Sequence, residues 1–261
     1  MTTPQISVPQ LVDFGDGFSA YTAAEMEARF IHNEIFNDHC YDIEKFSDTP
    51  FIVDAGANIG MFSMYMKRKY PSAKILAFEP APVTYGILQR NLELNNAADV
   101  QVHQCALGAQ ETTDTLTFFP LLPGNSTFVP EEKEVMKTLL EGVQPREVID
   151  KMFSTVEKVK VPVKRLSEFL KAEGNVETID LLKIDVEARE LDVCQGLDDE
   201  HWAKVRNVIL EIFDVGGALA AMEQFLKSKG FTVGTELAIK GQDDPAKPKL
   251  YNVLGRRKAQ A

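Results

Sequence analysis

The sequence predicts an α/β protein with one doubly wound, mostly parallel sheet that carries helices on both faces. From residue 51 onward, short runs with strand character alternate with helical stretches, an order typical of parallel sheets. A glycine-bearing turn follows the first of these strands. The chain has 261 residues, 44% of them hydrophobic and 26% charged, which suits one large globular domain.

The first part of the pattern lies between residues 51 and 107. Strands and helices are predicted to alternate there, with strands at 51–54, 74–79 and 100–107 and helices at 59–70 and 82–95. Pro71 ends the first helix, because a proline cannot continue helical hydrogen bonding. This order favours adjacent parallel strands.

The alternation stops between about residues 110 and 160, where we predict an insertion. It comprises an edge strand at 115–119, a Pro/Gly/Ser/Asn-rich segment at 119–130 and helices at 131–141 and 145–153. A proline in the alternating run at 158–163 predicts an edge or linking strand. The earlier pattern then resumes, with strands at 178–185, 205–213, 231–237 and 250–255 and helices at 187–195 and 217–229.

We therefore expect one domain over residues 50–261 and a separate N-terminal segment over residues 1–49. That segment contains an amphipathic stretch at 22–36 with Met26 and Phe30 at helical spacing. Such a helix packs its apolar side on a neighbouring surface, so the segment is predicted to be a cap or lid.

Charge and composition disfavour several classes of partner. The chain has 28 Lys and Arg against 39 Asp and Glu, for a formal net charge of −11, whereas a nucleic-acid binder needs a positive surface. No apolar run is long enough to span a bilayer, and no signal-peptide pattern is present. Three widely spaced cysteines, Cys40, Cys105 and Cys194, lack metal-ligand spacing and suit a reducing compartment. We expect a cytoplasmic protein without nucleic-acid, membrane or metal partners.

The most informative motif is the turn after the first parallel strand, Asp54-x-Gly56-x-Asn58-x-Gly60. Glycines there permit close approach of backbone to a ligand, and the following helix offers free N–H groups. Glu79 stands at the tip of the next strand, about 20 residues further on, where an acidic side chain can accept hydrogen bonds from a ribose diol. The spacing predicts a nucleoside-bearing cofactor.

Two cofactors use this arrangement. A nicotinamide dinucleotide needs G-x-G-x-x-G and places a pyrophosphate beside the turn, and a carboxylate from Asp54 would repel that group. S-adenosylmethionine carries a sulfonium and an ammonium and no phosphate, so the charge favours it. The remaining alternative is a glycine turn that serves packing alone.

Three separated segments, FIVDAGANIGMFS, ILAFEPAPVTYGILQRNLELN and IDLLKIDVEARELDV, resemble the FkbM family of S-adenosylmethionine-dependent methyltransferases. EMEARFIHNEIF also looks like the N-terminal helix of members from natural-product pathways. The resemblance implies a class I methyltransferase (Rossmann-like) fold, with a seven-stranded, mostly parallel sheet whose last strand is antiparallel. It implies cofactor contacts from a set that follows the first three strands: Asp54, Gly56, Ala57, Asn58, Gly60, Glu79, Pro80, Cys105 and Ala106.

One segment departs from the family pattern. Many members read KIDVEGAE, whereas this chain has Ala188 and Arg189 after Glu187. The departure affects a local turn and, by the same resemblance, the acceptor pocket.

Acidic residues are predicted to converge where the later strands end. Asp185 and Glu187 follow the fourth parallel strand, and Glu211 and Asp214 lie around the fifth. Asp185 or Glu187 is a candidate general base for an acceptor hydroxyl, and Asp185 is also a candidate for holding the cofactor's ammonium. Helix capping and a surface ion pair are the alternatives. The same carboxylates could bind Mg²⁺, although their spacing is not diagnostic.

Two further segments are candidates for acceptor binding. The insertion offers Asn125, Ser126 and Thr127 on a loop, and Glu211 is placed with them; a local turn is the alternative reading of the loop. Tyr21, His32 and Glu34 are predicted to form a lid, with His32 as a second-choice base because its ordinary pKa is near 6.5.

Together these observations predict an S-adenosylmethionine-dependent methyltransferase that releases S-adenosylhomocysteine. The expected reaction is O-methylation of a hydroxyl or carboxyl on a small natural-product or glycan-like acceptor. The alternatives are N- or C-methylation, an NAD(P)-dependent oxidoreductase, and a non-catalytic cofactor-binding module.

Overall fold

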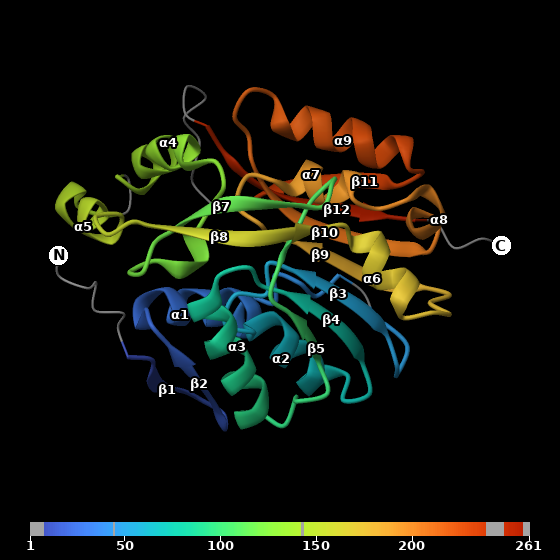
Figure 1. The fold of residues 1–261 in the computed structure, drawn as a ribbon, viewed down its shortest axis with the longest axis horizontal. Coiled ribbons are helices and arrows are strands. Elements are labelled where there is room, and N and C mark those ends of the chain that lie inside the picture. The colour runs from blue at the N-terminus through green and yellow to red at the C-terminus, as the bar shows by residue number, and fades with distance from the viewer. Residues whose placement is uncertain (1–7, 44, 142–143, 239–247, 258–261) are drawn as a thin grey trace.

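A computed structural model of the protein describes residues 8–43, 45–141, 144–238 and 248–257 (Figure 1). Its centre is a seven-stranded sheet, as predicted. The strands in spatial order are β11 (Thr232–Leu237), β12 (Leu250–Arg256), β10 (Val205–Phe213), β9 (Ile179–Ile184), β3 (Phe51–Ala55), β4 (Lys74–Phe78) and β5 (Gln101–His103). The pairs from β10 to β5 are parallel, and β12 is antiparallel to both of its neighbours.

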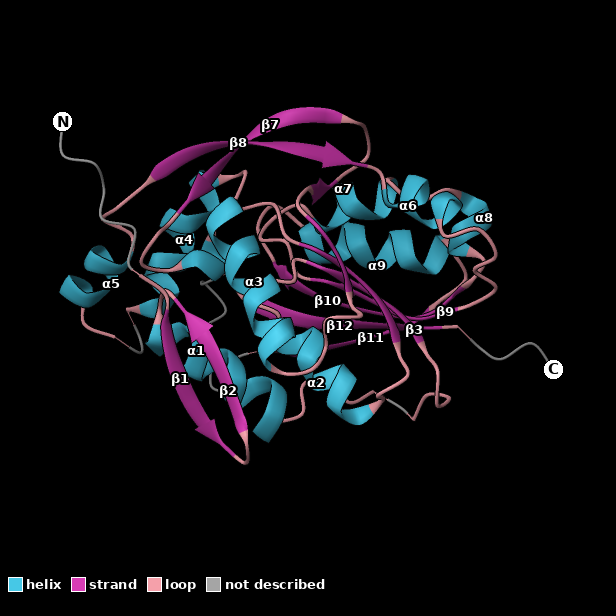
Figure 2. Ribbon diagram, turned by 60° about the horizontal axis from the view of Figure 1, so that its bottom comes forward, coloured by secondary structure: helices cyan, strands magenta, loops and turns pink. Residues whose placement is uncertain are grey.

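Helices cover both faces of this sheet (Figure 2). The helices on one face are α2 (Met61–Lys69) and α3 (Pro82–Leu94), and those on the other are α6 (Leu166–Ala172), α7 (Glu190–Gln195), α8 (Asp199–Trp202) and α9 (Ala218–Ser228). Successive strand residues alternate between the two cores: Ile52 packs with the first group and Val53 with the second. Period-two alternation of apolar residues on both sides explains the continuous hydrophobic strands.

The N-terminal segment contains a β-hairpin that the sequence reading missed. Strands β1 (Gln10–Gly15) and β2 (Phe18–Thr22) pair across a turn in which Gly15, Asp16 and Gly17 all have positive φ. The Asn91 side chain on α3 accepts from the N–H and donates to the carbonyl of Tyr21, at 2.6 and 2.9 Å. The predicted helix starts only at Glu25, as α1 (Glu25–His32), and continues as the π-helix η1 (Asn33–Asn37).

The insertion builds its own sheet above the edge where the parallel strands end. Strands β6 (Ala106–Leu107), β8 (Glu157–Lys164) and β7 (Thr112–Phe118) form it in that order, and η2 (Pro123–Asn125), α4 (Pro130–Leu140) and α5 (Arg146–Met152) lie between β7 and β8. The single strand predicted at 100–107 is therefore two strands in different sheets.

The run at 158–163 also differs from its prediction. It lies in β8, the middle strand, rather than at an edge. Pro162 is tolerated because β6 pairs only with Val163 and Lys164, so no partner on that side needs the missing N–H.

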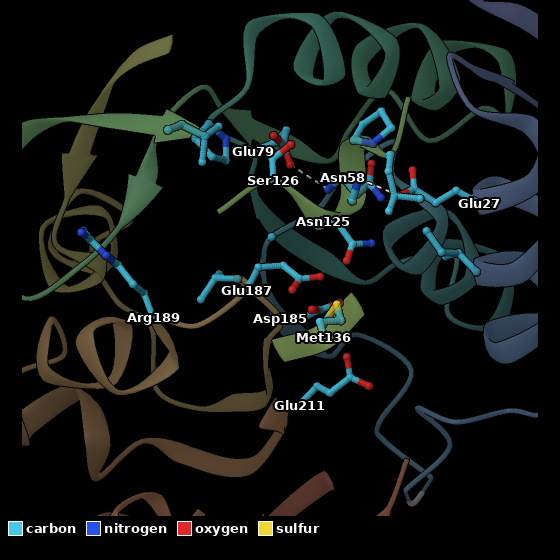
Figure 3. A pocket seen from close by; sticks show the side chains of 18 of the residues that line it. Glu27, Asn58, Glu79, Asn125, Ser126, Met136, Asp185, Glu187, Arg189 and Glu211 are labelled. Carbon is cyan, nitrogen blue, oxygen red and sulfur yellow. Dashed lines mark hydrogen bonds between the residues drawn. The ribbon is translucent and has the colours of Figure 1, made fainter. Parts of the chain in front are cut away.

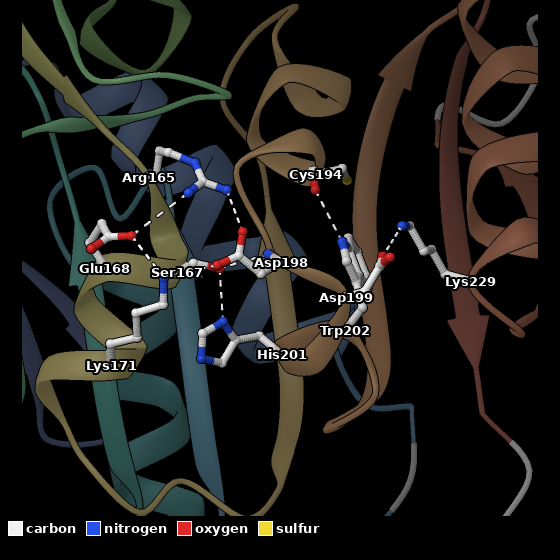
Figure 4. A network of polar contacts seen from close by, with 10 residues as sticks. All are labelled: Arg165, Ser167, Glu168, Lys171, Cys194, Asp198, Asp199, His201, Trp202 and Lys229. Carbon is white, nitrogen blue, oxygen red and sulfur yellow. Dashed lines mark hydrogen bonds and ion pairs between the residues drawn. The ribbon is translucent and has the colours of Figure 1, made fainter.

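A cluster of polar side chains joins α6 to α8, two helices that the sequence reading missed (Figure 4). The hydroxyl oxygen of the buried Ser167 accepts a hydrogen bond from the Asp198 N–H at 2.7 Å and lies 2.8 Å from His201 Nδ1. Hydrogen bonds from Arg165 and Lys171 lower the pKa of Asp198 to about 2. The cluster therefore holds α6 and α8 together.

Across the described part of the chain, no helix is both long and apolar enough to cross a bilayer.

Candidate active site

A cavity of about 380 Å³ lies at the carboxyl ends of the parallel strands, beneath α1 and the insertion (Figure 3). Part of its polar lining comes from four strand ends: Asn58 follows β3, Glu79 follows β4, Asp185 and Glu187 follow β9, and Glu211 lies in β10. A smaller cavity of about 100 Å³ adjoins it and shares Asn58, Asp185 and Glu211. This is the edge at which open α/β sheets bind ligands.

The glycine turn after β3 is shaped by close packing. Gly56 has a φ of +81°, and a Cβ built there would lie 1.7 Å from the carbonyl oxygen of Asp185. Gly60 has a φ of +93°, and its Cβ would lie 2.6 Å from Leu88 on α3. Both glycines therefore have a packing reason, and of the two only Gly56 also lines a cavity.

Asn58 and Glu79 form the polar wall beside this turn. The buried Glu79 accepts hydrogen bonds from the N–H groups of Asn58 and Ala81, at 3.0 and 2.8 Å. Burial raises the pKa of Glu79 to about 7, against the effect of these two donors. The buried amide oxygen of Asn58 has no hydrogen-bond partner among the described residues. A buried acceptor without a donor is costly, so this atom indicates a place for a ligand donor.

Asp54 does not face the cavity, which corrects the expectation that its carboxylate meets a cationic ligand. It is fully buried, 3.1 Å from the buried Lys183 ammonium, and accepts a hydrogen bond from Ser63 at 2.7 Å. Lys183 also donates to the carbonyl of Gly56 at 2.7 Å and lies 3.7 Å from Asp185. The pair neutralises itself inside the sheet and fixes the start of the glycine turn.

Carboxyl groups are nevertheless concentrated around the cavity. Its lining includes Glu27 from α1, Glu34 from η1 and Glu211 from β10. Burial raises the pKa of Glu27 to about 8, that of Glu34 to about 7 and that of Glu211 well above its ordinary range. Neighbouring carboxylates raise these pKa values further. Glu187 does so for Glu27, and Asp185 does so for Glu34 and Glu211. A cationic ligand would relieve this repulsion.

The insertion reaches the site through Thr127 and Lys133. Thr127 donates its hydroxyl hydrogen to the carbonyl of Glu187 at 2.8 Å. Lys133, on α4, donates to the Glu187 carboxylate and, at 3.2 Å, to Asn125. Sequence reasoning missed Lys133, because no pattern separates it from the other charged residues of that helix.

The N-terminal helix contacts the same region through Glu27, which the sequence reading also missed. Glu27 accepts a hydrogen bond from the Gly124 N–H of the insertion at 3.0 Å. A Cβ on Gly124 would lie 2.9 Å from the Asn58 amide nitrogen, so the insertion passes directly over the glycine turn. Glu27, Ile31 and Glu34 all line the cavity; their i, i+4, i+7 spacing on one helix side was an available signal.

Most of the predicted site residues line the two cavities. They are Gly56, Ala57, Asn58, Glu79, Pro80, Cys105, Ala106, Asn125, Ser126, Asp185, Glu187 and Glu211. Neither cavity is lined by Asp54, Gly60, Tyr21, His32 or Thr127.

Two of the predicted lid residues serve packing instead, which corrects their expected roles. His32 stacks between Phe14 and Phe36, with ring centroids 4.7 and 4.5 Å away, and burial lowers its pKa. The Tyr21 ring lies 3.4 Å from the Arg90 guanidinium, on the hairpin side of α3. His32 is therefore not placed to act as a base in the cavity.

The turn after β9 contains the departure from the family pattern. Glu187 and Ala188 have φ values of +57° and +85°, a region that favours glycine. Arg189 forms an ion pair with Asp114 of β7 at 2.8 Å, and its guanidinium lies 4.5 Å from the centre of the Phe128 ring. The arginine therefore ties this turn to the insertion, while Ala188 holds a strained backbone.

We expect Ala188→Gly to raise the free energy of unfolding by about 0.5–1 kcal/mol. Relief of a left-handed alanine is worth about 1–2 kcal/mol, and the extra freedom of glycine in the unfolded chain removes about 0.4–1 kcal/mol. Urea unfolding measures the change. Ala220→Gly, on an exposed position of α9, is the control and should lower the free energy of unfolding. An equal loss of stability in both variants would contradict the strain at Ala188.

The buried carboxyls predict that the ligand-free protein loses stability between pH 6.5 and 8.5. Glu27 and Glu190 have pKa values raised to about 8, both chiefly by burial. A carboxyl whose pKa is higher in the folded than in the unfolded protein stabilises the fold at low pH, and that contribution is lost as the pH rises from the unfolded value through the folded value. Histidines with lowered pKa values make the fold more stable as the pH rises, and they do so mainly below this pH range.

Thermal unfolding at several pH values measures this loss. Glu27→Gln should make the melting temperature fall less steeply across the window, because it removes one titrating group. A melting temperature that rises steadily from pH 6.5 to 8.5 would contradict the prediction.

The comparisons with known proteins agree with this geometry. The strand order, the antiparallel β12 and the cavity at the strand ends are those of the class I methyltransferase fold. Residues 54–233 match the family model described as the methyltransferase FkbM domain. The chain belongs to the FkbM methyltransferase family.

Several relatives align over most of their length. Methyltransferase 1 of Beauveria bassiana is 46% identical, over 97% of this chain and 100% of the relative. Methyltransferase sdnD of Sordaria araneosa is 50% identical over 89% and 92%, and the 31-O-demethyl-FK506 methyltransferase FkbM of Streptomyces tacrolimicus is 37% identical over 89% and 91%. A solved structure of methyltransferase FkbM from Methylobacillus flagellatus is 16% identical, with a TM-score of 0.49 over 85% of this chain and 47% of that one.

Proposed function

We propose that the protein transfers a methyl group from S-adenosylmethionine to a hydroxyl oxygen of a small molecule. The observation that carries this proposal is the Asn58–Glu79 wall, where a buried carboxylate stands beside an amide oxygen without a donor. These acceptors fit the hydroxyls of a ribose. The surrounding carboxylates fit a ligand with a sulfonium and an ammonium and disfavour the pyrophosphate of a nicotinamide dinucleotide.

S-adenosylmethionine, when bound, supplies a methyl group on a positively charged sulfur; its transfer breaks the C–S bond, forms a C–O bond and releases the hydroxyl proton. Two carboxylates of the chain are assigned the other two tasks, which are holding the cofactor and taking up the proton. Asp185 lines both cavities and lies beside the glycine turn, so we assign it to the charged end of the cofactor. Glu187 lines the larger cavity only and lies against the insertion, so we assign it to take the acceptor proton.

The acceptor is assigned to the part of the cavity that α1 and the insertion enclose. This part is mainly apolar, with Met26, Phe30, Leu116, Leu122, Phe128, Met136, Leu140 and Met152 in its lining. Acidic neighbours disfavour a second carboxylate, so of the two acceptor groups expected from the sequence we propose the hydroxyl.

We propose a cytoplasmic location and no nucleic-acid or membrane partner. The three cysteines are free in the structure, two of them buried, which suits a reducing compartment. The formal net charge of −11 disfavours an anionic partner surface.

Calorimetric titration with S-adenosylmethionine, S-adenosylhomocysteine and NADPH tests the cofactor. We expect the first two to bind, and Glu79→Gln to weaken both by at least about tenfold, the cost of losing one charge-assisted hydrogen bond. Glu223→Gln, on the outer α9, is the matched control and should bind like the unmodified protein. Preference for NADPH, or failure to bind either sulfur compound, would overturn the proposal.

A further inference from the structure

Lys133 is an unusual residue for the first turns of a polar helix, because its side chain is buried. Only 3% of the residue is exposed, although α4 begins with Pro130, Glu131 and Glu132 and carries further charged residues. Its ammonium donates to the Glu187 carboxylate, to Asn125 at 3.2 Å and to the sulfur of Met136 at 3.7 Å. Burying an ammonium is costly unless it is paired, so the location of Lys133 depends on Glu187.

Glu187 depends on Lys133 in turn. The charged groups that face it, among the described residues, come from several elements: Lys133 and Glu132 from α4, Glu27 from α1, Asp185 from its own turn, Glu190 from α7 and Glu211 from β10. In this set Lys133 is the cation, and the others are carboxyls. Burial raises the pKa of Glu187 and Asp185 adds to the rise, whereas the Lys133 ammonium opposes it.

The insertion also holds the backbone of Glu187. The Thr127 hydroxyl donates to the Glu187 carbonyl at 2.8 Å, at a residue whose φ is +57°. Main chain and side chain of Glu187 are thus both fastened by residues of the insertion, which lie 54 and 60 positions away in sequence. The main sheet alone does not supply these contacts.

We propose that Lys133 is a positioning residue, delivered by the insertion, that keeps the Glu187 carboxylate ionised and directed at the acceptor. This role rests on the proposed function of Glu187 as proton acceptor. In that reaction the hydroxyl proton passes to a Glu187 oxygen as the acceptor oxygen forms its new bond, and a Glu187 that already carries a proton cannot receive it. The insertion then determines both which acceptor fits and whether the base is active.

Carbon-13 NMR of the glutamate carboxyls tests this directly, without an acceptor. The protein is labelled at glutamate Cδ, the Glu187 signal is identified by its loss in Glu187→Gln, and its titration midpoint is followed with pH. We expect Lys133→Met and Lys133→Gln to raise that midpoint by at least about one pH unit, the usual effect of an opposite charge at contact distance. Lys133→Arg should restore it to within about half a unit.

Lys137→Met is the matched control, because Lys137 is on the same helix and pairs with Glu134. It should leave the Glu187 midpoint unchanged. A midpoint that stays within about 0.3 pH unit (about a third of the smallest expected shift) in both neutral Lys133 variants would overturn the proposal. Lys133→Gln keeps hydrogen-bonding capacity, so at least one neutral variant is expected to fold.

Titration with S-adenosylmethionine separates this inference from the proposed function. Lys133 lines neither cavity, so its neutral variants should bind the cofactor as tightly as the unmodified protein. Cofactor binding with an unmoved Glu187 midpoint would reject the role of Lys133 alone. A shifted midpoint in a protein that binds no S-adenosylmethionine would reject the proposed function and leave the pair itself intact.

Discussion

Replacing Lys183 with methionine is expected to lower the free energy of unfolding by about 3–5 kcal/mol. The reason is the fully buried Asp54, whose carboxylate would lose the ammonium at 3.1 Å and keep the hydrogen bond from Ser63. The carbonyl of Gly56 would also lose its donor. Urea unfolding measures the loss.

A double variant separates the unpaired charge from the lost packing. Asp54→Asn with Lys183→Met removes both charges at once and should recover at least half of the lost stability. Lys67→Met is the comparison at another buried lysine, because its partner Asp99 is 65% exposed and stays solvated. If Lys183→Met cost no more than Lys67→Met, the buried pair would not be the reason for the loss.

The largest effect on catalysis is expected from Glu187→Gln. An amide cannot take the acceptor proton, and loss of a general base typically costs 10²–10⁴-fold in rate. S-adenosylhomocysteine formation with a set of hydroxylated, mainly apolar acceptors measures the rate. The affinity for S-adenosylmethionine should change little, because Glu187 lines only the larger cavity.

Two further substitutions serve as comparisons for Glu187→Gln. Asp185→Asn should weaken cofactor binding more than Glu187→Gln does, because Asp185 lines both cavities. Glu131→Gln, an exposed carboxyl on α4, should behave like the unmodified protein. A Glu187→Gln enzyme that keeps its rate within tenfold of the unmodified protein would show that another group takes the proton.

The parts of the site that the sequence predicts are those fixed by local spacing. Asn58 and Glu79 follow consecutive strands of one strand–helix–strand unit, so their meeting is a consequence of the motif itself. The orientation of Asp54 was also available from alternation: Asp54 shares a strand face with Ile52, which packs under α2. Position at a strand end alone predicts a ligand contact for Asp54, whereas its strand face predicts burial, and the structure follows the strand face.

The parts that the sequence does not predict are contacts between distant elements. Lys133 meets Glu187 across 54 positions, and Glu27 meets Gly124 across 97. No periodicity distinguishes either side chain from its charged neighbours, because the distinction arises only when the insertion folds over the strand ends. His32 is a different case. A histidine side chain is a candidate base because of its ordinary pKa, but three phenylalanine rings surround His32 and keep it away from the cavity.

The short strand β6 has a consequence for how this protein can change during evolution. Ala106 and Leu107 pair with Val163 and Lys164, and the Gly108 N–H donates to the Lys164 carbonyl at 3.0 Å. The two ends of the insertion are thus held side by side by strand pairing. Insertions or deletions between those ends alter the chamber above the strand ends and leave the register of the seven strands intact, since loop length costs little once the ends are held together. Exchange of this one segment can therefore reshape the proposed acceptor chamber while the main sheet is kept.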